Sequence, residues 1–252
     1  MLSANRIKQI RSLQQKKFRK HANLFIAEGS RLIREILRST LEIESVFHTS
    51  TWTDIQLLKG KPAELITEKE MSRISGLKTP TNVLAVIKEP KNIFSFTRLN
   101  KGFSLALDDI QDPGNLGSII RTAHWFGIST ILCSHETADA YSPKVVQATM
   151  GALVNVSLFY VDLQSVLTQA YEMEIPLIGT FLNGENIYTC QLPKNGVLVM
   201  GNEGNGIQPN IERFITQRIS IPSFSTSSVG AESLNVSVAT AIACSELQRR
   251  AI

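Results

Sequence analysis

The stretch FSLALDDIQDPGNLGSIIRTAHWFG, residues 103–127, decides the fold. An apolar strand runs into two aspartates, Pro113 and Gly114 form a turn, and apolar residues at helical spacing follow. A strand that is apolar on both faces indicates a buried parallel sheet. In such sheets, ligands bind at the loops that leave the carboxyl ends of the strands. The sequence therefore predicts an α/β fold with a binding site after this strand.

The same alternation of strand and helix patterns continues on both sides of this stretch. We predict helices over 3–20 and 233–250. The predicted strands are 24–27, 43–48, 63–67, 82–88, 103–109, 130–133, 155–160, 175–181, 197–201 and 218–222.

A break in this pattern suggests two domains. Residues 89–102 contain Pro90 and end on Gly102, as a linker does. We therefore predict a small α/β domain over 1–95, a linker over 96–102 and a larger parallel-sheet domain over 103–252.

Length and composition exclude several classes of protein. The chain has 252 residues, 43% hydrophobic and 19% charged, enough for two domains of about 100–150 residues with real cores. No apolar run approaches the roughly 18–20 residues of a membrane span. Cys133, Cys190 and Cys244 are too far apart for a zinc or disulfide pattern. We expect buried free thiols in a reducing compartment, the cytoplasm, and no metal site.

The net charge of +4 is unevenly distributed. Residues 1–38 hold 10 Lys and Arg against two Glu, which gives +8 and leaves −4 for the rest. A basic end on a mildly acidic body suggests an anionic partner, while a solvated basic helix is the simpler explanation. This end has no apolar core of the kind a secretory signal needs. It also lacks acidic residues over its first 20 positions, so a transit peptide remains an alternative.

Three loops carry the candidate chemistry, and each also has a purely structural explanation. In the first, Asn115 is a plausible N-cap, and Arg121 lies in an otherwise apolar helix from which it could extend to water. In the second, VLVMGNEGNGIQP (197–209), three glycines surround Glu203 in an order that fits neither common phosphate-binding motif. A neutral or cationic ligand suits this loop better, although it could be a simple turn. In the third, Ser233 could be a plain N-cap.

Together, the three loops closely resemble the signature motifs of the SpoU class of RNA ribose methyltransferases, in the SPOUT superfamily. The matching segments are DPGNLGSIIRTAHWFG, LVMGNEGNGI, and IP followed by ESLNVSVATAIACSE. The stretch ADAYSPKVVQATMGAL (138–153) also resembles the family. Near the N-terminus, FRKHANLFIAEGSRLIREIL is similar to its auxiliary substrate-binding domain, which has a ribosomal-protein-like α/β fold.

The resemblance implies a parallel-sheet SPOUT domain over 103–252 with a deep trefoil knot, which general rules of chain topology would not predict. It implies S-adenosylmethionine as cofactor, a ribose 2′-hydroxyl in RNA as methyl acceptor, and a homodimer. Ribosomal RNA is favoured over transfer RNA, and neither DNA nor a membrane is expected as a partner. The apolar C-terminal helix also favours a dimer, through Val236, Val238, Ala239, Ile242 and Ala243.

The resemblance also assigns roles to individual residues. The cofactor-binding residues are Gly201, Ile221 and Leu234. The catalytic and RNA-facing residues are Asn115, Arg121, Glu203, Ser233 and Asn235. Because a guanidinium stays protonated, we expect Arg121 to bind a phosphate and stabilise the developing alkoxide, and the proton acceptor stays open.

One segment departs from the family pattern. Residues 223–230, SFSTSSVG, are several residues longer than the usual connection, which leaves the closure of the cofactor pocket open. The alternatives to an rRNA 2′-O-methyltransferase are a tRNA 2′-O-methyltransferase, a base-methylating relative, a catalytically silent RNA-binding relative and an unrelated nucleotide-binding enzyme.

Overall fold

The computed structural model describes residues 1–225 and 233–251, and the chain divides into two compact units. The first unit consists of Met1–Lys91 and Asp139–Val154. The second consists of Asn92–Ala138 and Asn155–Ile252. Residues 139–154 thus pack with the N-terminal strands. The domain bounds 1–95, 96–102 and 103–252 stay a prediction.

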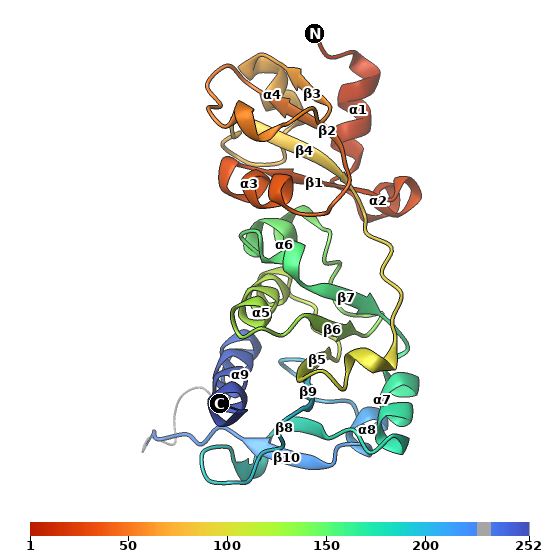
Figure 1. Cartoon of the computed structure of the whole chain (residues 1–252), viewed down its shortest axis with the longest axis vertical. Coiled ribbons are helices and arrows are strands. Elements are labelled where there is room, and N and C mark those ends of the chain that lie inside the picture. Colours follow the sequence, from red (N-terminus) through yellow and green to blue (C-terminus); the bar gives the residue numbers. More distant parts are fainter. Residues whose placement is uncertain (226–232, 252) are drawn as a thin grey trace. The chain divides into compact units, whose positions relative to one another are not determined.

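A four-stranded sheet forms the centre of the first unit (Figure 1). In the order β1-β4-β2-β3, β4 runs antiparallel to both its neighbours, and β3 is parallel to β2. The strands are β1 (Leu24–Glu28), β2 (Ile43–His48), β3 (Ala63–Leu65) and β4 (Val83–Lys88). All four lie within one residue of the predicted start, which confirms the strand pattern.

Helices cover both faces of this sheet. The helices of the first unit are α1 (Ala4–Ser12), α2 (Lys16–Ala22), α3 (Ser30–Arg38), α4 (Glu68–Ile74) and α6 (Pro143–Ala148), with a 3-10 turn at Ile55–Leu57. Residues of α1 and α4 pack with Ile26, Phe47 and Leu84 in one buried cluster. On the other face, the Phe25 ring packs at a tilt against the Tyr141 ring with centroids 5.0 Å apart, which places residues 139–154 against β1.

The single helix predicted over 3–20 is wrong. The chain forms α1 and α2 instead, and residues 13–15 turn between them. The Arg19 guanidinium donates to the carbonyl oxygens of Leu13 and Gln14, at 2.9 Å each. These carbonyls are therefore satisfied by a side chain and not by continuing the helix.

The second unit is a six-stranded parallel sheet in the order β10-β8-β9-β5-β6-β7. Its strands are β5 (Phe103–Leu107), β6 (Thr130–Cys133), β7 (Ser157–Tyr160), β8 (Leu177–Asn186), β9 (Gly196–Met200) and β10 (Gln217–Ser220). Every residue of β5, β6 and β9 is buried, as their apolar sequences predict. The predicted parallel α/β fold is confirmed.

The chain reverses direction across this sheet between β5 and β9. From β5 it proceeds outward through β6 and β7, and it then returns to build β8, β9 and β10 on the other side. At such a switch point, two neighbouring loops leave the sheet in opposite directions and open a crevice at the carboxyl ends of the strands. The loops after β5 and β9 are therefore placed to form a site.

Helices lie on both faces of the sheet (Figure 1). Helix α5 (Pro113–Trp125) packs against α9 (Val236–Ala251). On the opposite face, α7 (Leu163–Glu172) and α8 (Pro209–Glu212) enclose a buried cluster with β5 and β9. The remaining 3-10 turns are Phe96–Arg98 and Ala152–Asn155. Leu99, from the predicted linker, is fully buried in that cluster.

Strand β8 is longer than predicted and contains an interruption. Its pairing with β10 jumps from Gly179 to Glu185, so residues 180–184 bulge from the ladder. Leu182 in this bulge is 80% exposed. The knot implied by the family involves the chain between β10 and α9, where residues 226–232 lie outside the described part. The knot stays a prediction, and so does the effect of the longer 223–230 segment.

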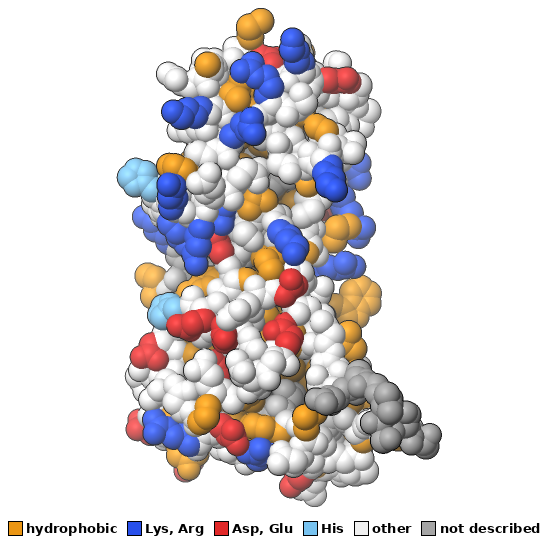
Figure 2. All heavy atoms as spheres, turned by 180° about the vertical axis from the view of Figure 1, so that it is seen from behind, with side chains coloured by type: hydrophobic (Ala, Val, Ile, Leu, Met, Phe, Trp, Pro, Cys, Tyr) orange, Lys and Arg blue, Asp and Glu red, His pale blue; other side chains and the backbone are white. Residues whose placement is uncertain are grey.

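Positive surface charge is concentrated on the unit that contains the basic residues 1–38. Figure 2 shows most of the Lys and Arg side chains of that face on the first unit. Among the described residues, no helix is long and apolar enough to cross a membrane. The three cysteines are free, with Cys133 and Cys244 buried and Cys190 half-buried. Burial raises the pKa of the Cys244 thiol to about 12, so this thiol stays protonated.

Candidate active site

The first loop begins a helix earlier than the sequence suggested. Asp112, and not Asn115, is the N-cap of α5, because its carboxylate accepts the Asn115 backbone N–H at 2.8 Å. Pro113 follows at the first helical position, where its missing N–H costs nothing. Asn115 therefore lies in the first turn of α5 with its side chain amide available for other contacts.

Asn115 joins the second and third loops to the first. Its Nδ2 donates to Glu203 Oε1, and its Oδ1 accepts from Asn235 Nδ2 at 3.0 Å. These partners are 88 and 120 residues away in the chain. The two bonds use both ends of one amide, so they fix the orientation of Asn115. Three of the five predicted catalytic residues are thereby in one hydrogen-bonded row.

Asn235 has a second role at the start of α9. Its Oδ1 accepts from the Ser237 backbone N–H at 3.0 Å and from the Ser237 hydroxyl at 2.7 Å. The N-cap interpretation of Ser233 is therefore wrong, since α9 begins at Val236 and Asn235 provides the capping oxygen. The Asn235 side chain therefore caps α9 and also binds Asn115, so a shift of α9 would move Asn235 relative to Asn115.

The second loop is a closed turn that presents Glu203. Asn202 and Gly206 exchange two backbone hydrogen bonds of 3.0 and 2.8 Å. The Asn202 Oδ1 accepts from the backbone N–H groups of Gly204 and Asn205, and its Nδ2 donates to the Asp109 carbonyl at 2.8 Å. The loop is thus tied both to itself and to the loop after β5.

Gly201 is required by this turn. A Cβ at this position would lie 2.2 Å from the carbonyl carbon of Gly206, a distance that real side chains do not reach. Segment 196–211 contains no lysine or arginine and one carboxylate, Glu203, at the tip of the turn. A neutral, closely approachable backbone beside a carboxylate fits a sulfonium cofactor better than a phosphate. The residues therefore fit S-adenosylmethionine.

Four other predicted site residues are not members of this hydrogen-bonded row. Arg121 is exposed on α5 and makes no hydrogen bond or ion pair with any described residue, and Ser233 is exposed before α9. Ile221 is half-buried after β10, and Leu234 is 49% exposed. Among the described residues, no hydrogen bond or ion pair joins these four residues to the side chains of Asn115, Glu203 or Asn235.

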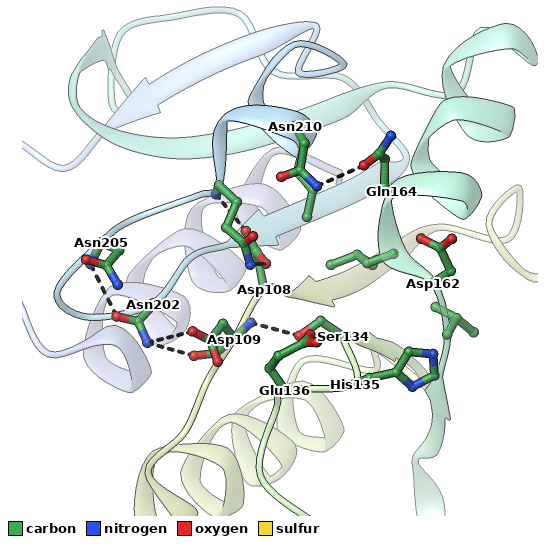
Figure 3. Close-up of a pocket in the computed structure, with 14 residues that line it drawn as sticks. Asp108, Asp109, Ser134, His135, Glu136, Asp162, Gln164, Asn202, Asn205 and Asn210 are labelled. Carbon is green, nitrogen blue, oxygen red and sulfur yellow. Dashed lines mark hydrogen bonds between the residues drawn. The ribbon is translucent and has the colours of Figure 1, made fainter.

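The structure also contains a cavity that sequence reasoning missed. It has a volume of about 810 Å³ and lies at the carboxyl ends of β5, β6 and β7, beside α8 (Figure 3). Its acidic side chains are Asp108, Asp109, Glu136 and Asp162, and none of the described residues that line it is a lysine or arginine. The sequence signal that could have revealed this cavity is a polar residue within two positions of the end of each of these strands, namely Asp108, Ser134 and Asp162.

Asp108 is the buried member of this group. Its carboxylate accepts from Gln208, from the backbone N–H at 2.7 Å and from Nε2 at 2.9 Å. Burial raises the pKa of Asp108, and the Gln208 hydrogen bonds oppose that shift. These bonds connect β5 to the end of the second loop. Among the described residues, no group of three or more His, Cys, Asp or Glu side chains is arranged to hold a metal ion.

The fold and these joined loops define a class of protein: parallel α/β proteins that assemble a site from loops after three strands beside a switch point. Residues 102–245 match the SpoU rRNA methylase family, and residues 4–85 match the MRM3-like substrate-binding domain. The chain belongs to the SpoU rRNA methylase family, as its three motifs predict.

Two named relatives match this chain in sequence over more than half of its length. The 23S rRNA (guanosine(2553)-2′-O)-methyltransferase RlmP of Bacillus subtilis is 28% identical over 239 residues, 94% of this chain and 93% of that protein. The 23S rRNA (guanosine-2′-O-)-methyltransferase RlmB of Neisseria meningitidis is 35% identical over 150 residues, 59% of this chain and 58% of that protein.

Solved structures cover the whole fold. A protein of Porphyromonas gingivalis assigned to the TrmH family of RNA methyltransferases is 38% identical, with a TM-score of 0.86 and 99% of both chains covered. An AdoMet-bound rRNA methyltransferase of Sinorhizobium meliloti is 28% identical, with a TM-score of 0.86, and covers 100% of this chain and 98% of that one.

Proposed function

We propose that the protein transfers a methyl group from S-adenosylmethionine to a ribose 2′-hydroxyl in ribosomal RNA. Membership of the SpoU rRNA methylase family supports this reaction. Two relatives are named as guanosine 2′-O-methyltransferases of 23S rRNA, and another is known with AdoMet bound. The predicted enzyme class and cofactor are thereby borne out.

The observation that carries the proposal is the row Glu203–Asn115–Asn235. Methyl transfer from a sulfonium is an in-line displacement, so the rate depends on how well the hydroxyl oxygen is positioned. When bound, the cofactor supplies the activated methyl group. Asn115 and Asn235 hold one another in fixed orientation, and Glu203 provides a hydrogen-bond acceptor beside them for a hydroxyl. This arrangement positions the acceptor before the reaction starts.

We assign Arg121 to the RNA phosphate and to charge that develops on the 2′-oxygen. Its exposure on α5 leaves the guanidinium accessible to a bound RNA. Ser233 lies two residues before Asn235 and is exposed, so we place it at the RNA-facing edge of the same site. Gly201, Ile221 and Leu234 belong to the cofactor side in this proposal, where two partly exposed apolar side chains would contact the adenosine.

We also propose that the protein works as a homodimer. Trp125 on α5 is 84% exposed, and Val238 on α9 is 47% exposed, on two helices that pack together. These exposed apolar side chains, one near the end of α5 and one near the start of α9, support an interface along the two helices. Val236 and Ala243 are buried within the protomer, so they contribute to its core and not to this contact. Free cysteines fit a cytoplasmic location.

Methyl transfer to total RNA tests the function. The protein is incubated with methyl-labelled S-adenosylmethionine and RNA from cells that lack it, and the labelled RNA is digested with alkali. Ribose methylation leaves alkali-resistant dinucleotides, and we expect the label in these dinucleotides from rRNA. Label in mononucleotides, which base methylation would give, or in tRNA alone, would contradict the proposal. Mass-spectrometric mapping then identifies the nucleotide.

A further inference from the structure

Helix α2 exposes lysines and an aromatic ring together. Lys16, Lys17, Lys20 and His21 are exposed, and Phe18 among them is 38% exposed. Figure 2 shows Lys and Arg side chains gathered over this part of the first unit, at the left of the view. The charge is locally unbalanced, because no acidic residue occurs before Glu28.

The acids that reach α2 do not cancel this charge. Glu89 pairs with Lys20 at 2.7 Å, and Asp139 pairs with Arg19 at 2.6 Å. Arg19 is only 2% exposed, so its pair lies beneath the helix and not on its surface. Lys16 and Lys17 keep a positive field around the Phe18 ring.

Buried contacts hold this short helix in place. Arg19, in its middle, donates twice to the Asp139 carboxylate and once to each of the Leu13 and Gln14 carbonyls. The exposed side chains therefore project from a fixed base. A surface that is already ordered loses less entropy when it binds a ligand.

We propose that α2 binds an unpaired stretch of the RNA substrate, with one nucleobase stacked on Phe18 and the adjoining phosphates on Lys16 and Lys17. The inference rests on the proposed function, since it takes RNA as the substrate. The Lys17 ammonium lies 4.8 Å from the centre of the Phe18 ring. A base stacked on that ring would bring its own phosphate to the same ammonium.

The aromatic ring selects unpaired RNA over duplex. In an A-form duplex, the faces of the bases are covered by their neighbours, so an aromatic ring cannot stack on them. A site for duplex RNA would therefore need only lysines, which bind the phosphates. An exposed ring between lysines adds a stacking surface that only a splayed base can use.

The test uses the full-length protein and fluorescein-labelled 12-nucleotide RNA of mixed sequence, followed by fluorescence anisotropy. The same strand is also presented as a blunt duplex and as an abasic version that keeps every phosphate. Stacking on an aromatic side chain contributes about 1–3 kcal/mol per base. We therefore expect Phe18→Ala to weaken single-strand binding by about 5- to 150-fold and to leave duplex and abasic binding within about twofold.

Three further variants separate stacking from charge and from folding. Phe18→Trp should retain single-strand affinity, whereas Phe18→Leu, which keeps an apolar side chain, should lose it. Lys17→Ala should weaken all three probes and reduce the slope of log affinity against log salt by about 0.7. The matched control is Ile55→Ala, because Ile55 is 49% exposed on the first unit without flanking lysines.

Equal loss on intact and abasic RNA, or no loss with Phe18→Ala, would overturn the stacking proposal. Tighter binding of the duplex than of the single strand would also overturn it. Wild-type methyl transfer to rRNA is measured in parallel. If methyl transfer is present while the Phe18 variants bind normally, the inference fails and the proposed function stands.

Discussion

The buried ion pair between Arg19 and Asp139 should control the stability of the first unit. The two side chains are 3% and 7% exposed, and their charged atoms are 2.6 Å apart. Asp139→Ala removes the carboxylate and leaves a guanidinium buried with only two carbonyl partners. Breaking a buried pair in this way costs about 3–5 kcal/mol. With a urea m-value of about 1.5 kcal/mol/M, the unfolding midpoint should fall by roughly 2–3 M.

Tryptophan fluorescence isolates this transition. Trp52 is 1% exposed in the first unit, whereas Trp125 is 84% exposed in the second, and the chain contains no other tryptophan. In a Trp125→Phe background, urea unfolding followed by fluorescence therefore reports on the surroundings of Trp52. The matched control is Glu42→Ala, because Glu42 pairs with Lys88 where both side chains are more than half exposed. That variant should lose less than about 1 kcal/mol.

A double replacement tests the cause of the loss. Arg19→Met together with Asp139→Leu removes both charges, so it should recover part of the stability lost in Asp139→Ala. Recovery should be incomplete, because the Leu13 and Gln14 carbonyls lose their donor. If Asp139→Ala loses no more stability than Glu42→Ala, the pair does not hold the first unit together and the reasoning is refuted.

Four further outcomes follow from the site and the surface. Glu203→Gln should reduce single-turnover methyl transfer at saturating S-adenosylmethionine by about 10²–10³-fold; an unchanged rate would remove Glu203 from the reaction. Arg121→Ala should likewise lower the rate and not cofactor affinity, with poor rescue by lysine, because an ammonium lacks the planar fork; a near wild-type rate would return Arg121 to the role of a solvated surface residue. Hydrogen bonds from the backbone N–H of Thr67 and then of Leu2 lower the pKa of Glu70 to about 2, so its contribution to stability is present above about pH 4.5 and is lost as pH falls toward 2. Urea unfolding at pH 6 and pH 3 should therefore show a deficit in Glu70→Gln that shrinks at the lower pH, and a constant deficit would contradict this assignment. Trp125→Glu should convert the dimer to monomer in analytical ultracentrifugation, whereas a wild-type protein that is monomeric at micromolar concentration would rule out the proposed interface.

The sequence by itself determined the strand pattern of both units, the parallel arrangement of the second sheet and the three loops predicted to carry the site. Strand and helix periodicities are local, and apolar runs such as 103–107 show burial on both faces without knowledge of their neighbours. The motifs that follow β5, β9 and β10 could be found for the same reason, since each lies within a short continuous stretch. Membership of the family followed from their order in the chain.

Contacts between distant residues decided the rest. The Asn115 amide is oriented by partners 88 and 120 residues away, and no local pattern specifies such a bond. The helix expected over 3–20 ends early because Arg19 takes the carbonyls of the turn, where it is held by Asp139 across 120 residues. The acidic cavity needed three strand ends to meet at one edge of the sheet. A buried charge must find its partner wherever the fold places one, so its position is a property of the tertiary structure and not of the local sequence.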